Sequence, residues 1–593
     1  MLKSSCSFKV ALLMLTTMIL AGCGMSHYPA RLDDPKAVYL NSFGARGDGI
    51  ADDSNALQAA INKVQETTRK GIVFIPEGRY RLTKTVFVWN GIRLIGWGAN
   101  RPTFVLAANT HGYQQGDNKY LLHFVSDRPR PNENIRDANP GTFYSALTNI
   151  NLEIQDGNPV AVGVRSHWAQ HCFISHVDFH IGSGRAGVEQ VGNEMEDCRF
   201  YGGDFGISTT KPSPSWPFLL IDSHFEGQRK AAIDTEEGGM TLIRDSFRNV
   251  PTAVNIHENR AEELIMKDCR LEDITGPALV ISDEFNARCI INLQDVACQR
   301  VPTLANFRSS GHNVYAPAPV YLITRFTHGN TIADFGATAG IKTTIEATSL
   351  PAMPPPVASD LPALPTPDTW VNLLSLGAKG DGVTDDTAVL QQAIAAHKTI
   401  YLPTGRYLVS DTIKLQPDTV LIGLSPFSTQ IFVADANPSF TGQGGWKPMI
   451  ESSRGGSNIL TGIGLDSGNN KGAIACKWMA GEKSYINDVK FVGGHGTYRA
   501  DGSGVPAYNK DRTADGLPGR VWDTIPYSLW ITDNGGGTFK DIWTANPIAQ
   551  AGFCVENTST SGRMYAISVE HHVSHEVIFR GASNFQVFAL QTE

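Results

Sequence analysis

The chain has 593 residues, a formal net charge of −8 and 18% charged residues. Its length suits two large domains, each able to bury a core, and its mildly acidic balance argues against a nucleic-acid partner, because phosphate binding requires a basic face. Two of the nine cysteines lie within the first 23 residues. The other seven have no Cys-x-x-Cys spacing, so we expect small buried residues rather than a disulfide framework or a zinc site.

The first 23 residues predict an export signal. Lys3 and Lys9 precede an apolar run over residues 10–20 that is too short to span a bilayer comfortably. The run ends in Leu-Ala-Gly-Cys, which resembles the lipobox of bacterial lipoproteins and implies that Cys23 is lipidated and becomes the mature N-terminus. The alternative is an ordinary cleaved signal peptide.

The residue after this cysteine is Gly24. In bacterial lipoproteins an aspartate at that position would signal retention in the inner membrane. We therefore expect an exported protein, lipid-anchored to the bacterial cell envelope at the outer membrane or the cell surface. Its contact with the membrane is expected through the lipid anchor only.

An opening segment occurs twice in the chain. Residues 43–54 (FGARGDGIADDS) return as residues 376–387 (LGAKGDGVTDDT), 333 positions later. Each copy continues into an amphipathic pattern that predicts a helix, and then into a strand and a Pro-x-Gly-Arg-Tyr turn. The duplication predicts two domains that begin alike.

The helix that begins at each Asp-Asp pair is expected to cap the first turn of its domain, with acidic and hydroxyl residues at its N-terminus. The alternative is a calcium or phosphate loop. This alternative lacks the lysine of a P-loop and the closing glutamate of an EF-hand.

Short alternating segments recur between the two openings. Six of them end at residues 152, 179, 200, 225, 247 and 271, which are 21 to 27 positions apart. This period predicts a parallel β-solenoid. We therefore expect an all-β fold of two tandem right-handed parallel β-helices, each with an N-terminal capping helix. The expected boundaries are 36–348 for the first domain, 349–368 for a Pro-rich linker and 369–593 for the second domain.

The repeated Gly-Ala-Arg/Lys-Gly-Asp-Gly…Asp-Asp openings resemble the pectate lyase superfamily, the pectin-lyase-like β-helix of pectinases, tailspikes and epimerases. The resemblance implies the fold and leaves the activity open, because this fold supports many reactions.

The last 30 residues resemble glycoside hydrolase family 55, whose tandem β-helix enzymes act on β-1,3-glucans. The matching segments are Val-Glu-His at 569–571 and Leu-Gln-Thr-Glu at 590–593, and in the first domain Phe-Tyr at 143–144 and His-Trp-Ala-Gln at 167–170. The resemblance implies hydrolysis with inversion. It assigns Glu593 as the general acid, Glu570 and Gln170 as holders of the attacking water, and substrate contacts to a further set: Trp168, Gln591 and His571. The family continues past its acid, so we expect the native chain to extend beyond Glu593.

Strand alternation agrees in part with these roles. Ile567 and Val569 alternate inward, which leaves Glu570 outward, and inward positions at Phe588 and Leu590 leave Gln591 and Glu593 outward. The two glutamates are 23 residues apart, close to one turn, and would stack about 4.8 Å apart. One of two carboxyls that close keeps a proton toward neutral pH. The alternative is two surface glutamates without a catalytic role. The short spacing also fits inversion poorly, because inverting enzymes usually separate their carboxyls by about 6.5–9.5 Å.

The leading hypothesis is a surface-anchored glycoside hydrolase that cleaves a β-1,3-glucan from its end. The alternatives are a polysaccharide lyase acting on uronic acids, which the net charge of −8 disfavours, and a non-catalytic polysaccharide-binding protein. No cofactor or metal is expected, because the neighbouring His571 and His572 should face opposite sides of a strand. Seven tryptophans are candidates for stacking on sugar rings: Trp168, Trp216, Trp446, Trp478, Trp522, Trp530 and Trp543.

Overall fold

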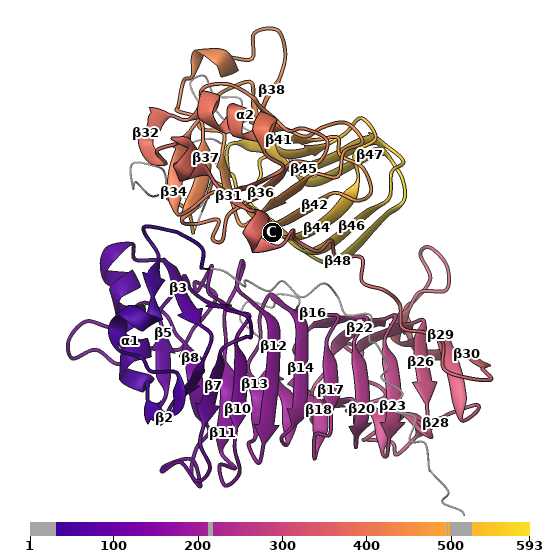
Figure 1. Cartoon of the computed structure of the whole chain (residues 1–593). Coiled ribbons are helices and arrows are strands. Elements are labelled where there is room, and N and C mark those ends of the chain that lie inside the picture. The colour runs from indigo at the N-terminus through magenta and orange to yellow at the C-terminus, as the bar shows by residue number, and fades with distance from the viewer. Residues whose placement is uncertain (1–30, 211–217, 495, 499–503, 505–524) are drawn as a thin grey trace, which may run out of the picture.

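The computed structural model describes residues 31–210, 218–494, 496–498, 504 and 525–593. Strands β1 (Val38–Tyr39) to β30 (Gly340–Ser349) form a 20-stranded and a 10-stranded sheet, here called the N-terminal solenoid. Strands β31 (Val371–Asn372) to β48 (Phe585–Thr592) form a 12-stranded and a 6-stranded sheet, the C-terminal solenoid. Among the described residues no strand of one solenoid pairs with a strand of the other, and Figure 1 shows the two lying against each other. The expected all-β, parallel β-helix class is confirmed.

The N-terminal solenoid is built from three parallel ladders. The first contains β1, β3 (Gly71–Pro76), β6 (Ile92–Trp97), β9 (Ala146–Thr148), β12 (Phe173–Gly182), β14 (Glu194–Gly202), β16 (Phe218–Ile221), β19 (Met240–Ile243), β22 (Glu263–Lys267) and β25 (Ile290–Gln294). The second contains β2 (Asp48–Asp52), β4 (Arg79–Arg81), β7 (Thr103–Leu106), β10 (Asn151–Ile154), β12, β14, β17 (His224–Glu226), β20 (Ser246–Val250), β23 (Arg270–Ile274) and β26 (Val296–Gln299). The third contains β5 (Val86–Val88), β8 (Lys119–Phe124), β11 (Ala161–Arg165), β13 (Ala186–Glu189), β15 (Phe205–Thr210), β18 (Ala231–Glu236), β21 (Val254–Ile256), β24 (Pro277–Ile281) and β27 (Thr303–Phe307). Antiparallel strands close the stack: β28 (Asn313–Tyr315), β29 (Val320–Thr331) and β30.

The C-terminal solenoid repeats this plan. Its first ladder contains β31, β33 (Thr399–Tyr401), β36 (Val420–Ile422), β39 (Ile459–Thr461), β42 (Tyr485–Phe491), β44 (Gly537–Thr544), β46 (Gly562–Val569) and β48. Its second contains β32 (Asp381–Asp385), β34 (Gly405–Leu408), β37 (Thr429–Phe432) and β40 (Gly464–Asp466), which then joins β42. Its third contains β35 (Ile413–Lys414), β38 (Lys447–Glu451), β41 (Ala473–Trp478), β43 (Ile525–Ile531), β45 (Ala549–Thr558) and β47 (His575–Ala582).

The predicted repeat is the structural repeat. Phe179 pairs in register with Phe200, Phe200 with Phe225, and Phe225 with Phe247. Their rings are stacked inside the solenoid with centroids 4.8, 4.6 and 5.0 Å apart. A buried aromatic at one position of each turn therefore sets the register of the core. The seven cysteines that the structure describes are buried and free, as expected.

A corner residue with positive φ separates the first and second ladders. In the N-terminal solenoid Asp222 (φ 55°) and Asp268 (φ 56°) occupy it, and in the C-terminal solenoid Asp488 (φ 51°) does. Asp and Asn tolerate this left-handed conformation better than other residues with a Cβ, because their short polar side chains can bond locally.

Ala589 takes the same corner in β48, with φ 56°, and resets the alternation of the strand. Leu590 pairs with the buried Ile567, whereas Phe588 faces outward and stacks on Tyr565 with ring centroids 5.5 Å apart. The prediction that Phe588 points inward is therefore wrong.

Helices α1 (Ser54–Thr67) and α2 (Thr387–Ala396) cover the first turns of the two solenoids, as predicted (Figure 1). The second aspartate of each Asp-Asp pair holds the preceding loop. Asp53 accepts hydrogen bonds from the backbone N–H groups of Arg46 and Gly47 at 2.8 and 3.0 Å, and Asp386 binds its loop in the same way. The repeated motif is thus used to fold the cap.

Candidate functional site: the seam between the solenoids

The first ladders of the two solenoids face each other, and we call the surface where they meet the seam. At one end Phe74 and Ile95 pack with Ile422 in a single buried cluster. At the other end Ile221 packs with Tyr565. These apolar contacts fix the two solenoids side by side and bury the polar groups that lie between them.

Arg93 and Asp488 form an ion pair across the seam. The guanidinium lies 2.5 and 3.0 Å from the two carboxylate oxygens, and the side chains are 2% and 6% exposed. Arg93 also donates to the backbone oxygens of Tyr144 and Leu424. Burial lowers the pKa of Arg93, but Asp488 outweighs it and raises that pKa above its usual value. A buried bidentate pair with further hydrogen bonds constrains how the solenoids dock.

His171 extends this network. Its Nδ1 lies 3.1 Å from an oxygen of Asp488 and 3.5 Å from an oxygen of Asp541, and its side chain is fully buried. Burial opposes its charge, but the two carboxylates raise the pKa of His171 above its usual value. The N-terminal solenoid thus places two basic groups on the acidic corner residues of the C-terminal solenoid.

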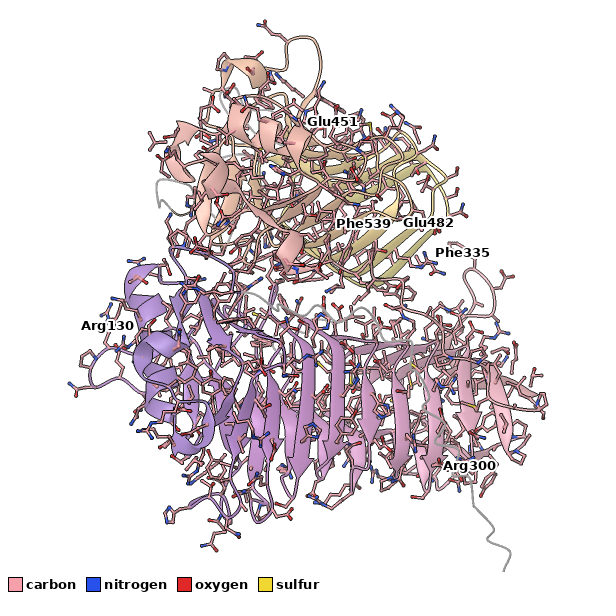
Figure 2. All side chains as sticks on the ribbon, viewed as in Figure 1. Arg130, Arg300, Phe335, Glu451, Glu482 and Phe539 are labelled. Atoms are coloured by element: carbon pink, nitrogen blue, oxygen red, sulfur yellow. The ribbon has the colours of Figure 1, made fainter. Side chains whose placement is uncertain are left out.

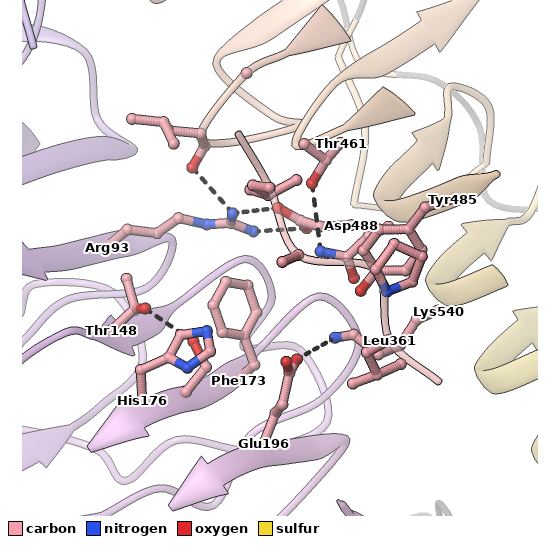
Figure 3. Close-up of a pocket in the computed structure, with 17 residues that line it drawn as sticks. Arg93, Thr148, Phe173, His176, Glu196, Leu361, Thr461, Tyr485, Asp488 and Lys540 are labelled. Carbon is pink, nitrogen blue, oxygen red and sulfur yellow. Dashed lines mark hydrogen bonds and ion pairs between the residues drawn. The ribbon is translucent and has the colours of Figure 1, made fainter. Parts of the chain in front are cut away.

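A second group of charges lies around a cavity of about 110 Å³ in the seam (Figure 3). Lys540 contacts Glu194 and lies 3.0 Å from Glu196. Burial raises the pKa of Glu194 to about 8, although Lys540 opposes this shift. The linker residues 361–364 also line this cavity, so the Pro-rich segment is part of the seam.

Gln170 and Glu570 meet farther along the seam. The amide Nε2 of Gln170 donates to Glu570 Oε1 at 2.8 Å and to Gln591 Oε1 at 3.1 Å. Ser568 Oγ lies 2.7 Å from Glu570 Oε1 and 2.6 Å from Gln591 Oε1. Glu570 is 1% exposed. Four polar side chains, one of them from the other solenoid, therefore converge around an almost fully buried carboxyl.

A cavity of about 10 Å³ adjoins these groups and is lined in part by Gln170, Asn193, Ser568 and Gln591. This volume is close to the minimum that holds one water molecule. The surrounding amide and hydroxyl groups can donate to and accept from such a water.

Glu593 lies one turn beyond Glu570. Val569 pairs with Thr592, so the residue after each, Glu570 and Glu593, takes the same place on successive turns. The N–H of His571 donates to the backbone oxygen of Glu593 at 3.0 Å. Side-chain ligand atoms of Glu570, His571 and Glu593 lie within 4.8 Å of one another, and Glu593 is exposed whereas Glu570 is buried. The carboxyl spacing is below the range of about 6.5–9.5 Å that is usual for inversion.

The structure therefore brings five predicted residues together: Gln170, Glu570, His571, Gln591 and Glu593. Their roles stay predictions.

Trp168 does not join this group. Its ring is 2% exposed, packs edge-on against Phe124 in the core and donates from Nε1 to Gly192 O at 3.0 Å. The predicted contact of Trp168 with substrate does not fit this position, since no face of the ring is available to a sugar. Gln170, two residues later, reaches the seam and contacts Glu570.

Several predictions concern other residues. Cys23, Trp216 and Trp522 lie outside the described residues. His572 is buried and bonds to Thr544 and Glu576, so the neighbouring histidines do not converge on one point.

Lys490 is a residue of the seam that sequence reasoning missed. It is 1% exposed, and its Nζ lies 3.4 Å from the centroid of the Trp543 ring, with no hydrogen-bond partner in the described part of the chain. Burial lowers the pKa of Lys490 well below its usual value, while Glu570 opposes this shift. A lysine at an outward strand position normally predicts a solvated side chain, but the Trp543 ring, in register with Lys490 on the next turn of the same solenoid, lies against this one.

The fold and the repeated openings define a pectate-lyase-like parallel β-helix protein. The chain matches the family described as "Rhamnogalacturonase A/epimerase, pectate lyase-like" over residues 38–278 and 370–569, and it belongs to that family. The family establishes the architecture, and the reaction must be argued from the site.

The relatives that the chain matches carry names of different kinds. The chain is 22% identical over 452 residues to "Non-secreted LysM effector LysM19" of Penicillium expansum, covering 65% of this chain and 33% of that protein. It is 22% identical over 647 residues to "Glucan 1,3-beta-glucosidase" of Cochliobolus carbonum, covering 93% of this chain and 75% of that protein. The chain spans 33% and 42% of the lengths of two LysM effectors that it matches.

Among solved structures, the chain is similar to sacteLam55A from Streptomyces sp. SirexAA-E, with 12% identity, a TM-score of 0.44, and coverage of 96% of this chain and 81% of that one. Within the described residues, no helix is long and apolar enough to cross a membrane.

Proposed function

We propose that the protein is a glycoside hydrolase of the family 55 type that cleaves a neutral β-1,3-glucan from its end, with Cys23 lipidated at the cell envelope. The contact that carries this proposal is the 2.8 Å hydrogen bond from Gln170 to Glu570 across the seam. Similarity to a protein named Glucan 1,3-beta-glucosidase, over 93% of this chain and 75% of that protein, supports the substrate class.

In the proposed reaction a water molecule is held against Glu570, with Gln170 and Ser568 orienting it. Glu570 accepts a proton from the water as its oxygen attacks the anomeric carbon, and Glu593 donates a proton to the departing glycosidic oxygen. The bond from the anomeric carbon to that oxygen breaks as the new bond to water forms. In this proposal Gln591 and His571, which lie beside Gln170 and the two glutamates, contact the sugar.

Inversion is part of the proposal, which has the attacking water bind on the buried side of Glu570 and the acid act from Glu593 at the exposed edge. Glu593 must then turn away from Glu570 when substrate binds, since inversion needs room for both a sugar and a water. Proton NMR of the first product tests this step. α-Glucose formed first from laminarin indicates inversion, and β-glucose formed first refutes it.

A non-catalytic polysaccharide-binding protein is the second candidate. The observation that favours it is the lack of space at the site, because the groups around Glu570 bond to one another and the adjoining cavity measures only about 10 Å³. A hydrolase of this geometry must admit its substrate from the side of Glu593.

Reducing-sugar release from laminarin, with pectin and polygalacturonate in parallel, tests the proposal. Glu570→Gln and Glu593→Gln should each lower glucose release by a factor of about 10²–10⁴, the usual contribution of an acid or base. Glu482→Gln, an exposed glutamate of the same solenoid, is the matched control and should retain full activity. Unsaturated products from the uronates would indicate a lyase, and a folded wild type that cleaves none of the three would favour the binding protein.

A further inference from the structure

An aromatic cluster lies on the C-terminal solenoid away from the seam. Trp446 immediately precedes β38, and Tyr527 and Trp530 belong to β43. Figure 1 shows β38 and its neighbour β41 on the side that faces away from the N-terminal solenoid, and Figure 2 places Glu451, the last residue of β38, on the same side. The cluster is therefore separate from the site at Glu570.

Trp446 is held upright by the other two rings. Its ring lies edge-on to Tyr527, with centroids 5.3 Å apart at 78°, and to Trp530, 5.8 Å apart at 81°. Trp446 is nevertheless 49% exposed, whereas Tyr527 is 6% exposed. The two less exposed rings thus support an indole of which about half remains open to solvent, and an exposed aromatic surface of this kind is typical of a binding site.

Hydrogen-bonding groups surround the rings. The Nε1 of Trp530 donates to Glu556 Oε1 at 2.9 Å, and the other oxygen of Glu556 lies 3.1 Å from Nε of Arg580. Lys477 lies 4.8 Å from the centroid of Trp530 and 3.0 Å from a carboxylate oxygen of Asp533. Asp533 also pairs with Arg454 at 3.1 Å. Each of these charges therefore has an opposite partner, and the rim offers donors and acceptors that are already paired.

We propose that this cluster is a second carbohydrate-binding site, which holds a neutral polysaccharide chain on the surface. The C–H face of a pyranose ring packs on Trp446, and its hydroxyls bond to the rim at Glu556 and Arg580. The balanced rim favours a neutral chain over a polyuronate, which would require unpaired cations. A stable protein partner buries about 800 Å² on each side, more than one half-exposed indole supplies. The assignment of the chain as a β-glucan rests on the proposed function.

Native affinity electrophoresis in gels that contain laminarin tests the proposal. The full chain carries Glu570→Gln throughout, so that the polymer in the gel is not hydrolysed. Adding Trp446→Ala should weaken binding by about five- to tenfold, the loss of roughly one aromatic contact. Trp446→Phe should restore most of the binding, because it keeps an aromatic face. The control is Phe335→Ala, which removes a fully exposed ring from the N-terminal solenoid (Figure 2) and should change nothing.

Two results would overturn the proposal. The first is a Trp446→Ala protein that binds laminarin as tightly as the Phe335→Ala protein. The second is equal retardation in gels of polygalacturonate and of laminarin, which would refute the neutral ligand.

The outcome is distinguishable from that of the proposed function. If the wild type cleaves no glucan but Trp446→Ala weakens binding, the hydrolase proposal fails and the surface site stands. If the wild type cleaves laminarin and Trp446→Ala binds normally, the surface site fails alone. With both correct, Trp446→Ala should cleave a short laminari-oligosaccharide within twofold of the wild-type rate and an insoluble glucan several-fold more slowly.

Discussion

Replacing Arg93 by methionine should destabilise the protein far more than the same change at a surface arginine. The variant removes a guanidinium that lies 2.5 Å from Asp488, with both side chains almost fully buried. Two unit charges about 4 Å apart interact by about 4 kcal/mol at an effective dielectric constant of about 20, and breaking a buried pair costs about 3–5 kcal/mol because the remaining charge stays buried. We therefore expect Arg93→Met to lower the free energy of unfolding by about 3–5 kcal/mol.

Urea unfolding followed by circular dichroism measures this loss, with Arg79→Met as the matched control. Arg79 pairs with Glu153 at 2.7 Å, but its side chain is 51% exposed, so its loss should cost less than about 1 kcal/mol. Arg93→Met combined with Asp488→Asn should recover part of the stability, because no buried carboxylate is then left without its arginine and asparagine keeps the left-handed corner. Equal losses from Arg93→Met and Arg79→Met would refute the reasoning that the ion pair between Arg93 and Asp488 is shielded from solvent.

Three further predictions concern protonation, the cap and the anchor. The folded-state pKa of His171 is raised above its unfolded value of about 6.5, so the stability that the charged imidazole adds is fully present below pH 6.5 and is lost as the pH rises through the raised pKa. The stability lost in His171→Gln should therefore shrink from pH 6 to pH 9. A loss independent of pH would contradict this. Asp386→Ala leaves two backbone N–H groups without their acceptor and should lower the free energy of unfolding by about 2–3 kcal/mol, measured in urea. The control is Asp418→Ala at an exposed aspartate, which should lower it by less than about 0.5 kcal/mol. Equal losses would contradict a structural role for the loop. Cys23→Ser should move the protein from the membrane fraction to the soluble fraction on immunoblots, and an unchanged distribution would exclude lipidation at Cys23.

The sequence predicts those features of the fold that come from contacts between equivalent residues on successive turns. The column of Phe179, Phe200 and Phe225 was predictable because each ring packs against its equivalent one turn away. Phe588 was not, because a left-handed alanine one residue later shifts the alternation, and alanine carries none of the corner signal of aspartate.

The site is predictable only where a local motif marks it. Glu570 and Glu593 lie on successive turns of one solenoid, so their spacing in sequence carries over to their spacing in space. Arg93 carries no such mark, since its partner and its burial come from docking two surfaces that are far apart in the chain. Lys490 carries none either, although the ring that it contacts, Trp543, lies on the next turn of its own solenoid. Trp168 illustrates the opposite case, because a residue only two positions before Gln170 faces the core instead of the seam.

The central claim is that one reaction centre is assembled from both solenoids, and Gln170→Ala tests it most directly. This residue belongs to the N-terminal solenoid, while the glutamate that it contacts belongs to the C-terminal one. We predict that glucose release from laminarin falls by about 10²-fold, as expected when the attacking water is misplaced, while Gln294→Ala, an exposed glutamine of the same solenoid, retains the wild-type rate. Wild-type glucose release by Gln170→Ala would contradict the claim.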